Sequence, residues 1–215
     1  MNQKPLFALK PGLKLILASA SPRRKEFLDS WGLPYDILPP KLIEPEPDEQ
    51  ETPTDYTLRL AKAKAQAAMD QLDLGLKSKS LIISADTVVT LKGQILGKPC
   101  DAKEALEMLK LLAGHKHLVT SSVYLLFPPT FKDPYFSFSE SSTVYFHSFT
   151  SEILASYVQT GEPLDKAGAY AIQGRGAFLI EKIEGSWATV VGLPICRLVQ
   201  ELLLRGFLVA KEPLL

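Results

Sequence analysis

The stretch LILASASPRR, residues 15–24, decides how this chain folds. Its first four residues are apolar and predict a buried strand, and the small residues after them predict a turn into a helix. Ser21 favours the N-cap and Pro22 suits the first helical position, so free backbone N–H groups would point beyond the strand end. The helix dipole and the guanidinium groups of Arg23 and Arg24 favour an anion there. The stretch predicts a phosphate site, although a plain turn with two solvated arginines has the same pattern.

Length and composition predict one α/β domain over residues 1–215, with an N-terminal extension at 1–12 and a C-terminal tail at 206–215. The chain is 46% hydrophobic and carries 24 basic and 24 acidic residues. This balance argues against the broad basic surface of a duplex-binding protein and against attachment to a membrane surface. A free nucleotide, by contrast, needs only local positive charge.

Cysteine use and the first residues indicate a cytoplasmic protein. Cys100 and Cys196 have neither CxxC nor Cys/His ligand spacing, so we expect no disulfide framework and no zinc site. Lys14 interrupts the apolar stretch that superficially resembles a signal peptide, and no later segment approaches the length of a membrane span. We therefore expect the mature chain to begin near Met1.

Apolar periodicity, caps and turn residues predict a mixed order of strands and helices. The expected helices run over 22–31, from Thr52 or Thr54 to near Gly75, from an Asp101 capping box to Gly114, over 150–157, and from Gly192 onward. The expected strands cover 15–18, 35–38, 81–89, 118–127, 142–149, 177–183 and 188–191, with loops at 44–51 and 128–139. This order predicts an elongated α/β sheet around a central cleft between two lobes.

Asp86 is the residue that most requires an explanation, because it sits inside the β-branched run of residues 81–89. A buried strand holds an ionised carboxylate only if that group is paired, hydrogen-bonded or bound to a metal. We therefore interpret Asp86 as a functional residue.

Four sequence blocks occur in an order that resembles a known family. They are LILASASPRRKEFL from Leu15, SADTVV from Ser84, GQILGKP from Gly93, and TGEPLDKAGAYAIQGRGAFLIEKIEGSWATVVGLP from Thr160. Over residues 13–204 the chain resembles the Maf family of nucleotide pyrophosphatases, long called septum formation inhibitors. The resemblance implies a Maf/Ham1-like (ITPase-like) α/β fold with an elongated mixed sheet. It also implies hydrolysis of nucleoside triphosphates to the monophosphate and pyrophosphate with a divalent cation, Mg²⁺ or Mn²⁺.

The resemblance also implies roles for particular residues. Those expected to bind substrate are Ser19, Arg23, Arg24, Lys64 and Gln173, and those expected to be catalytic are Asp86, Lys98 and Glu44. Glu44 and Asp86 would hold the metal. The family's usual Asp-Glu pair is replaced here by Ile43-Glu44-Pro45-Glu46, so Glu46 remains the alternative to Glu44.

The chemistry of pyrophosphate release fits these residue types. Water must attack the α-phosphorus while negative charge builds on the leaving group, which calls for cations along the phosphates and a carboxylate near the water. The first requirement is met by Arg23, Arg24, Lys64 and Lys98. The second is met by Glu44 and Asp86, whose oxygens suit hard cations, and Asp86 is also the candidate for orienting or deprotonating the water.

Several of these residues also have a structural interpretation. Lys64 lies on a lysine-rich amphipathic helix where a solvated charge is the usual outcome, and Lys98 before Pro99 could cover a turn. Asp165 and Lys166 either contact the substrate or form a salt bridge that shapes the base pocket.

Within the family, the motifs resemble the branch that acts on dTTP and UTP, including modified uridine nucleotides. The alternatives are a 7-methyl-GTP pyrophosphatase, a non-catalytic nucleotide-binding regulator of septum formation, and a single-stranded nucleic-acid binder that uses the aromatic loop near Phe131. We expect a small-molecule nucleotide as partner, no nucleic acid and no membrane. The family's tendency to dimerise, together with the apolar C-terminal helix, predicts a homodimer.

Overall fold

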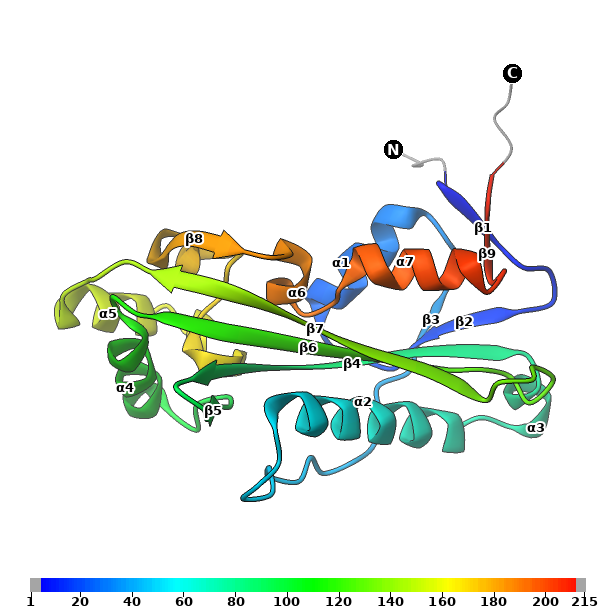
Figure 1. Cartoon of the computed structure of the whole chain (residues 1–215), viewed down its shortest axis with the longest axis horizontal. Helices are drawn as coiled ribbons and strands as arrows, with labels where there is room; N and C mark the ends of the chain where they lie inside the picture. The colour runs from blue at the N-terminus through cyan, green and yellow to red at the C-terminus, as the bar shows by residue number, and fades with distance from the viewer. Residues whose placement is uncertain (1–4, 212–215) are drawn as a thin grey trace.

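The computed structural model describes residues 5–211 and contains a seven-stranded mixed sheet (Figure 1). Along the sheet the order is β3-β2-β4-β6-β7-β8, and β5 pairs with β4. The strands are β2 (Lys14–Leu17), β3 (Asp36–Ile37), β4 (Ser80–Leu91), β5 (Gln94–Leu96), β6 (Lys116–Leu126), β7 (Tyr135–Phe146) and β8 (Ile180–Glu184). The predicted mixed α/β class is confirmed. No helix in the described part is long and apolar enough to cross a membrane.

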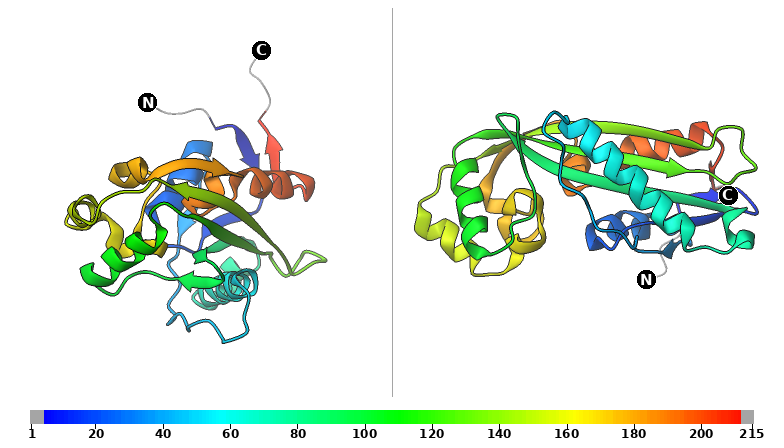
Figure 2. Two further views of the ribbon diagram at one scale, coloured as in Figure 1. Left: turned by 60° about the vertical axis from the view of Figure 1, so that its left-hand side comes forward. Right: turned by 90° about the horizontal axis from the view of Figure 1, so that it is seen from below.

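Helices cover both faces of the sheet. Helix α2 (Pro53–Asp70) lies along one face, and α1 (Pro22–Trp31), α6 (Trp187–Val191) and α7 (Ile195–Leu204) lie on the other (Figures 1 and 2). The long strands β4, β6 and β7 continue past these helices to a second group, α4 (Ala102–Leu112) and α5 (Ser151–Val158). The short helix α3 (Leu74–Lys77) precedes β4.

The hydrophobic core is divided in the same way as the helices. One cluster joins the sheet to α1 and α7 and includes Leu17, Leu28 and Leu198, all fully buried. Another joins the far halves of the long strands to α4 and α5, including Leu109 and Leu154. Smaller clusters lie under α2. The two largest clusters, on shared strands, divide the described part into the two lobes that the sequence predicts.

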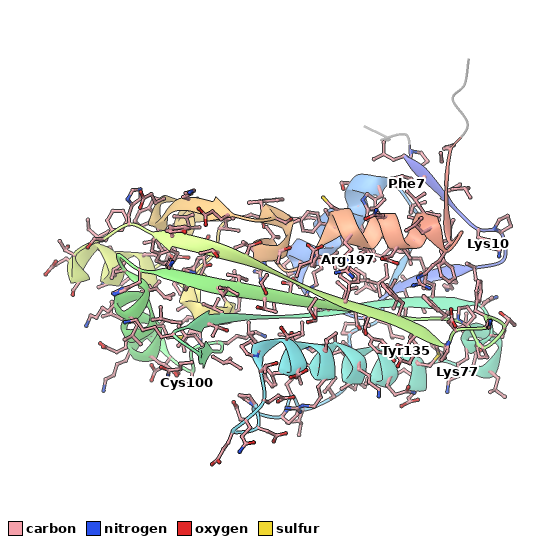
Figure 3. The ribbon with its side chains drawn as sticks, viewed as in Figure 1. Phe7, Lys10, Lys77, Cys100, Tyr135 and Arg197 are labelled. Atoms are coloured by element: carbon pink, nitrogen blue, oxygen red, sulfur yellow. The ribbon has the colours of Figure 1, made fainter. Side chains whose placement is uncertain are left out.

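The faces of β4 follow its alternating side chains. Ile82 packs with α2, whereas Leu81 and Ile83 pack with α1 and α7. On the α7 side, the guanidinium of Arg197 lies over the ring of Phe138 of β7, 4.6 Å from its centroid (Figure 3).

One edge of β4 is open in the middle. β2 runs parallel to β4 and pairs with it up to Ile83, and β5 pairs with it antiparallel from Val89 onward. Between these points, no strand in the described part pairs with residues 84–88 on this edge. The carboxyl end of β2 and the turn after it therefore face an unpaired stretch of β4, which is a common place for a ligand site in α/β sheets.

Several predicted element boundaries are wrong. α2 ends at Asp70, not near Gly75, because Asp73 caps the separate helix α3. β7 begins at Tyr135, so the predicted loop 128–139 is shorter, and its aromatic residues alternate on a strand instead.

The segments at 177–183 and 188–191 also differ from prediction. Residues Gly174–Leu179 form the 3-10 helix η3, and only Ile180–Glu184 is a strand. Residues Trp187–Val191 form the short helix α6, which ends at Gly192 in the left-handed region (φ 114°). The β-branched residues of this segment favour a strand, and the strand prediction rested on them.

The residues predicted as extension and tail contain a pair of strands. β1 (Phe7–Leu9) pairs antiparallel with β9 (Leu208–Ala210), so the beginning and end of the described chain lie side by side. This two-stranded ribbon is separate from the main sheet.

His117 of β6 is buried in the second lobe with 3% of its surface exposed. Its Nε2 lies 2.9 Å from the Tyr170 hydroxyl, and its ring packs edge-on against Phe146 and Tyr170. Burial lowers the pKa of His117 from 6.5 to about 4.

This histidine makes the stability of the fold sensitive to acid. Because the unfolded chain binds the proton below pH 6.5 and the folded chain only near pH 4, the free energy of unfolding should fall by about 3 kcal/mol over that range. Urea unfolding at several pH values should show this slope in the wild type and a weaker slope in His117→Gln. His115→Gln, at an exposed site, is the control. Equal slopes in wild type and His117→Gln would contradict the assignment.

Candidate active site

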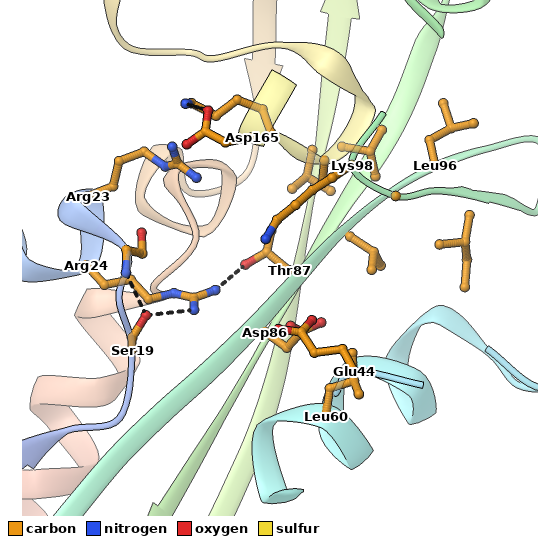
Figure 4. Close-up of a pocket in the computed structure, with 18 of the residues that line it drawn as sticks. Ser19, Arg23, Arg24, Glu44, Leu60, Asp86, Thr87, Leu96, Lys98 and Asp165 are labelled. Carbon is orange, nitrogen blue, oxygen red and sulfur yellow. Dashed lines mark hydrogen bonds and ion pairs between the residues drawn. The ribbon is translucent and has the colours of Figure 1, made fainter. Parts of the chain in front are cut away.

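A cavity of about 1020 Å³ lies between the two lobes, at the open edge of β4 (Figure 4). Its walls come from the turn at residues 18–24, the acidic loop near 44–47, β4 at 86–89, the segment 94–98 and the segment 165–172. These parts are distant in the sequence, and the fold brings them together around Asp86.

The turn after β2 is held by hydrogen bonds of its own residues. The Ser21 N–H donates to Ser19 Oγ at 3.1 Å, so Ser19 organises the turn. Ser21 occupies the N-cap position with an extended backbone, but its side chain makes no capping hydrogen bond. The predicted N-cap position of Ser21 is therefore confirmed, although its side chain leaves the helix N–H groups uncapped. Pro22 begins the helix, as predicted.

Arg24 ties this turn to two other elements. Its Nε donates to Gly192 O at 2.8 Å, its Nη1 to Ser19 Oγ at 3.3 Å and its Nη2 to Thr87 Oγ1 at 3.1 Å. Burial lowers the pKa of Arg24, and the nearby Arg23 lowers it further, while Asp86 opposes this shift. A half-buried guanidinium beside the start of a helix attracts an anion electrostatically.

Arg23 and Lys98 also line the cavity. Arg23 Nε donates to Val191 O at 3.4 Å, and its guanidinium extends toward Asp165 (Figure 4). Lys98 follows β5, and its exposed side chain extends toward Thr87. Three cationic side chains, from α1 and from the segment after β5, thus surround one end of the cavity.

Asp165 and Lys166 form an ion pair with each other. Both also line the cavity, and the hydrogen bond from Lys166 lowers the pKa of Asp165 although burial raises it. The salt-bridge interpretation of these two residues therefore matches the geometry.

Lys64 is buried between two carboxylates. Its Nζ lies 2.5 Å from Asp86 Oδ1 and 3.0 Å from Glu44 Oε1. The side chains of Lys64 and Asp86 are 9% and 8% exposed, whereas that of Glu44 is 46% exposed. Lys64 is therefore not a solvated surface lysine, because α2 points it inward at β4.

Burial dominates the electrostatics of Asp86. It raises the pKa of this carboxyl, and the positive charges of Lys64 and Arg24 oppose the shift. An ionised Asp86 thus depends on these two cations. The arrangement can therefore keep a carboxylate charged in the wall of the cavity.

The acidic loop that carries Glu44 is fastened to α2. The Tyr56 hydroxyl donates to Pro45 O at 3.1 Å, and Arg59 donates to both carboxylate oxygens of Glu51 at 2.7 and 2.6 Å. Arg59 also donates to the backbone O of Glu46 at 3.2 Å. Both Glu44 and Glu46 line the cavity, but it is Glu44 whose carboxylate meets Lys64.

Hydroxyl groups that sequence reasoning missed connect β4 to its surroundings. Thr87 Oγ1 lies 2.8 Å from Ser121 Oγ on one face, and on the other Thr57 Oγ1 lies 2.6 Å from Ser122 Oγ. Ser121 and Ser122 pair with Thr87 and Asp86 across β4 and β6. The signal for this network was a pair of serines inside an otherwise apolar strand.

Seven of the predicted site residues line the one cavity: Ser19, Arg23, Arg24, Glu44, Lys64, Asp86 and Lys98. Gln173 does not belong to that lining. It is half-buried and directly follows Ile172, and Tyr170, Ala171 and Ile172 do form part of the wall.

Comparisons with known proteins find relatives that match most of this chain. The chain is 46% identical over 200 residues to a dTTP/UTP pyrophosphatase of Nitratidesulfovibrio vulgaris. The matched stretch covers 93% of this chain and 91% of the relative. It is 43% identical to a protein of the same name from Oleidesulfovibrio alaskensis, over 91% of this chain and 86% of the relative. A third, from Bacillus anthracis, is 42% identical over 88% of this chain and 94% of the relative. A family model described as Maf-like protein matches residues 14–204. The chain therefore belongs to the Maf family.

Proposed function

We propose that this protein is a nucleoside triphosphate pyrophosphatase that hydrolyses dTTP and UTP to the monophosphate and pyrophosphate. The main support is that the buried Lys64–Asp86 pair and the cationic turn of Arg23 and Arg24 line one cavity. The names of the relatives, which are dTTP/UTP pyrophosphatases, support the choice of substrate.

In the proposed reaction the triphosphate lies along the cationic end of the cavity. Arg23 and Lys98 bind its oxygens there, and Arg24 keeps the turn in place. Asp86 orients a water molecule and takes its proton as the water oxygen bonds to the α-phosphorus. The bond from that phosphorus to the bridging oxygen breaks, and pyrophosphate leaves with the negative charge that Lys98 and Arg23 stabilise.

The donor set of the cavity fits a hard divalent cation that is shared with the substrate. The carboxylates of Glu44 and Asp86 both contact Lys64 Nζ and both line the cavity, although the described residues contain no group of three or more His, Cys, Asp or Glu that could hold a metal alone. Mg²⁺ and Mn²⁺ suit such a site because they are held by one or two carboxylates plus substrate phosphates. Once bound there, the ion would neutralise phosphate charge.

We also propose that the enzyme acts in the cytoplasm as a homodimer and removes unwanted nucleotides, including modified uridine triphosphates. Cys100 and Cys196 are both free and exposed, which suits a reducing compartment. Leu203 and Leu204 of α7 are exposed apolar side chains that a second copy could cover.

The substrate assignment is tested by a panel of nucleotides. With Mg²⁺ or Mn²⁺ present, we expect pyrophosphate release from dTTP and UTP to exceed that from CTP, dATP, GTP and 7-methyl-GTP. Measurement of kcat/KM for each nucleotide gives the ranking. Turnover of 7-methyl-GTP alone would refute the pyrimidine assignment, and UTP binding without any pyrophosphate would refute the enzyme assignment.

Asp86→Asn and Lys98→Ala should each lower kcat at least about 100-fold, because the first removes the proton acceptor and the second removes a cation beside the leaving group. Circular dichroism should show an unchanged fold. Lys92→Ala, at an exposed turn outside the cavity, is the control for Lys98→Ala and should keep the wild-type rate. A near-normal rate in either active-site variant would remove that residue from the mechanism.

Glu44 and Glu46 form a matched pair for a further test. Since the Glu44 carboxylate contacts Lys64, Glu44→Gln should lower kcat/KM at least about tenfold and raise the metal concentration needed for half-maximal rate. Glu46→Gln should change kcat/KM and the metal requirement by less than about twofold, because Arg59 bonds the backbone carbonyl of Glu46 and not its side chain. The reverse pattern would assign the second acidic role to Glu46.

A further inference from the structure

Glu162 lies outside the cavity lining but is bound to the backbone of a distant loop. It opens the short 3-10 helix η1 (Glu162–Asp165), and its two carboxylate oxygens accept hydrogen bonds from Arg175 N–H at 3.0 Å and Gly176 N–H at 2.8 Å. These amides lie in the first turn of η3 (Gly174–Leu179), where a helix leaves its N–H groups without internal partners. One side chain therefore satisfies two adjacent amides.

Tyr157 of α5 holds the other end of the same loop. Its hydroxyl accepts a hydrogen bond from Ala171 N–H at 3.2 Å, and the same hydroxyl lies close enough to the Glu162 carboxylate to lower the pKa of Glu162. Together, Tyr157 and Glu162 fasten the segment from Ala171 to Gly176 at both ends. We refer to these two side chains as the loop clamp.

The glycines of the loop let the clamp approach the backbone closely. Gly174 has φ +81°, and a Cβ there would come closer than 3.0 Å to the Glu162 carboxylate. A Cβ on Gly176 would meet the Tyr157 hydroxyl at a similarly impossible distance. The positions next to Glu162 and Tyr157 in the loop therefore require glycine.

The clamp contains an ionised carboxylate. Burial by itself raises the pKa of Glu162, but the hydrogen bonds from Arg175 N–H and Gly176 N–H and the nearby Tyr157 hydroxyl outweigh it, so the pKa lies below its usual value. Charge-assisted bonds of this kind are stronger than those of a neutral amide.

The loop that the clamp holds continues the cavity wall. Tyr170, Ala171 and Ile172 line the cavity and bring no charged side chain to it. The cations of the lining come from the turn at 18–24, Lys64 and Lys98, and from Lys166, which is paired with Asp165. A nucleotide has a polyanionic end and an uncharged base and sugar. The uncharged wall therefore suits the nucleoside part.

We propose that Glu162 is a positioning residue for nucleoside recognition, which acts with Tyr157 by holding the wall Tyr170–Ile172 in shape. The inference rests on the proposed function, because it concerns how that cavity selects its substrate. It assigns no part in the bond-breaking step to Glu162, which does not line the cavity.

Glu162→Gln tests this role with little change in side-chain volume. The amide nitrogen cannot accept from an N–H, so one clamp bond is lost and the other weakens. We expect KM for UTP and dTTP to rise about tenfold, with kcat changed less than about twofold. The inhibition constant of inorganic tripolyphosphate, which lacks a nucleoside, should stay within about twofold. Glu181→Gln, at an exposed site, is the control and should match the wild type.

Tyr157→Phe removes the other half of the clamp and should shift KM in the same direction. Because both side chains hold one loop, the double variant should raise KM by less than the product of the two factors measured for the single variants. Unchanged KM in both single variants would overturn the inference, as would a parallel loss of nucleotide and tripolyphosphate binding. A wild-type protein that releases no pyrophosphate from UTP or dTTP would refute the proposed function instead.

Discussion

The site depends on one electrostatic arrangement, the Lys64 ammonium enclosed by Asp86 and Glu44. A lone buried ammonium or carboxylate is costly to remove from water, so the buried Lys64 and Asp86 require each other, and the half-exposed Glu44 adds a second negative charge beside Lys64. The requirement links three separate parts of the chain: α2, the middle of β4 and the acidic loop. It also explains why α2 lies along the sheet with a lysine on its buried face.

The second constraint is the gap at the edge of β4. β2 stops pairing at Ile83 and β5 starts at Val89, so the strand remains continuous while its partner changes. Alternation then presents Asp86 to α2 and Thr87 to Arg24 on opposite faces. The strand β4 therefore places the Asp86 carboxylate on one side of the cavity, and on the other side its Thr87 binds Arg24 of the cationic turn.

Much of the fold could be predicted from local patterns, and the errors have physical causes. Helix α1 was predicted with its observed bounds because Pro22 and Gly32 mark both ends, and the Asp101 cap of α4 was identified by its spacing to Glu104. Residues 188–191 were predicted as a strand because β-branched residues favour strands, yet tertiary packing makes them part of the helix Trp187–Val191. For the site, motif resemblance identified the charged residues of the cavity. It could not identify the burial of Lys64 or the clamp at Glu162, because each depends on contacts between segments far apart in the chain.

The pairing of β1 with β9 couples the local unfolding of these two strands. Both strands leave the first lobe together, and Lys10 N–H donates to Phe207 O at 2.9 Å just inside the ribbon. Fraying of either strand thus deprives the other of its hydrogen-bond partners, so β1 and β9 behave as one cooperative unit. A short peptide bridge between them would close the chain into a ring, and new ends could then be opened in a surface turn far from the nucleotide cavity.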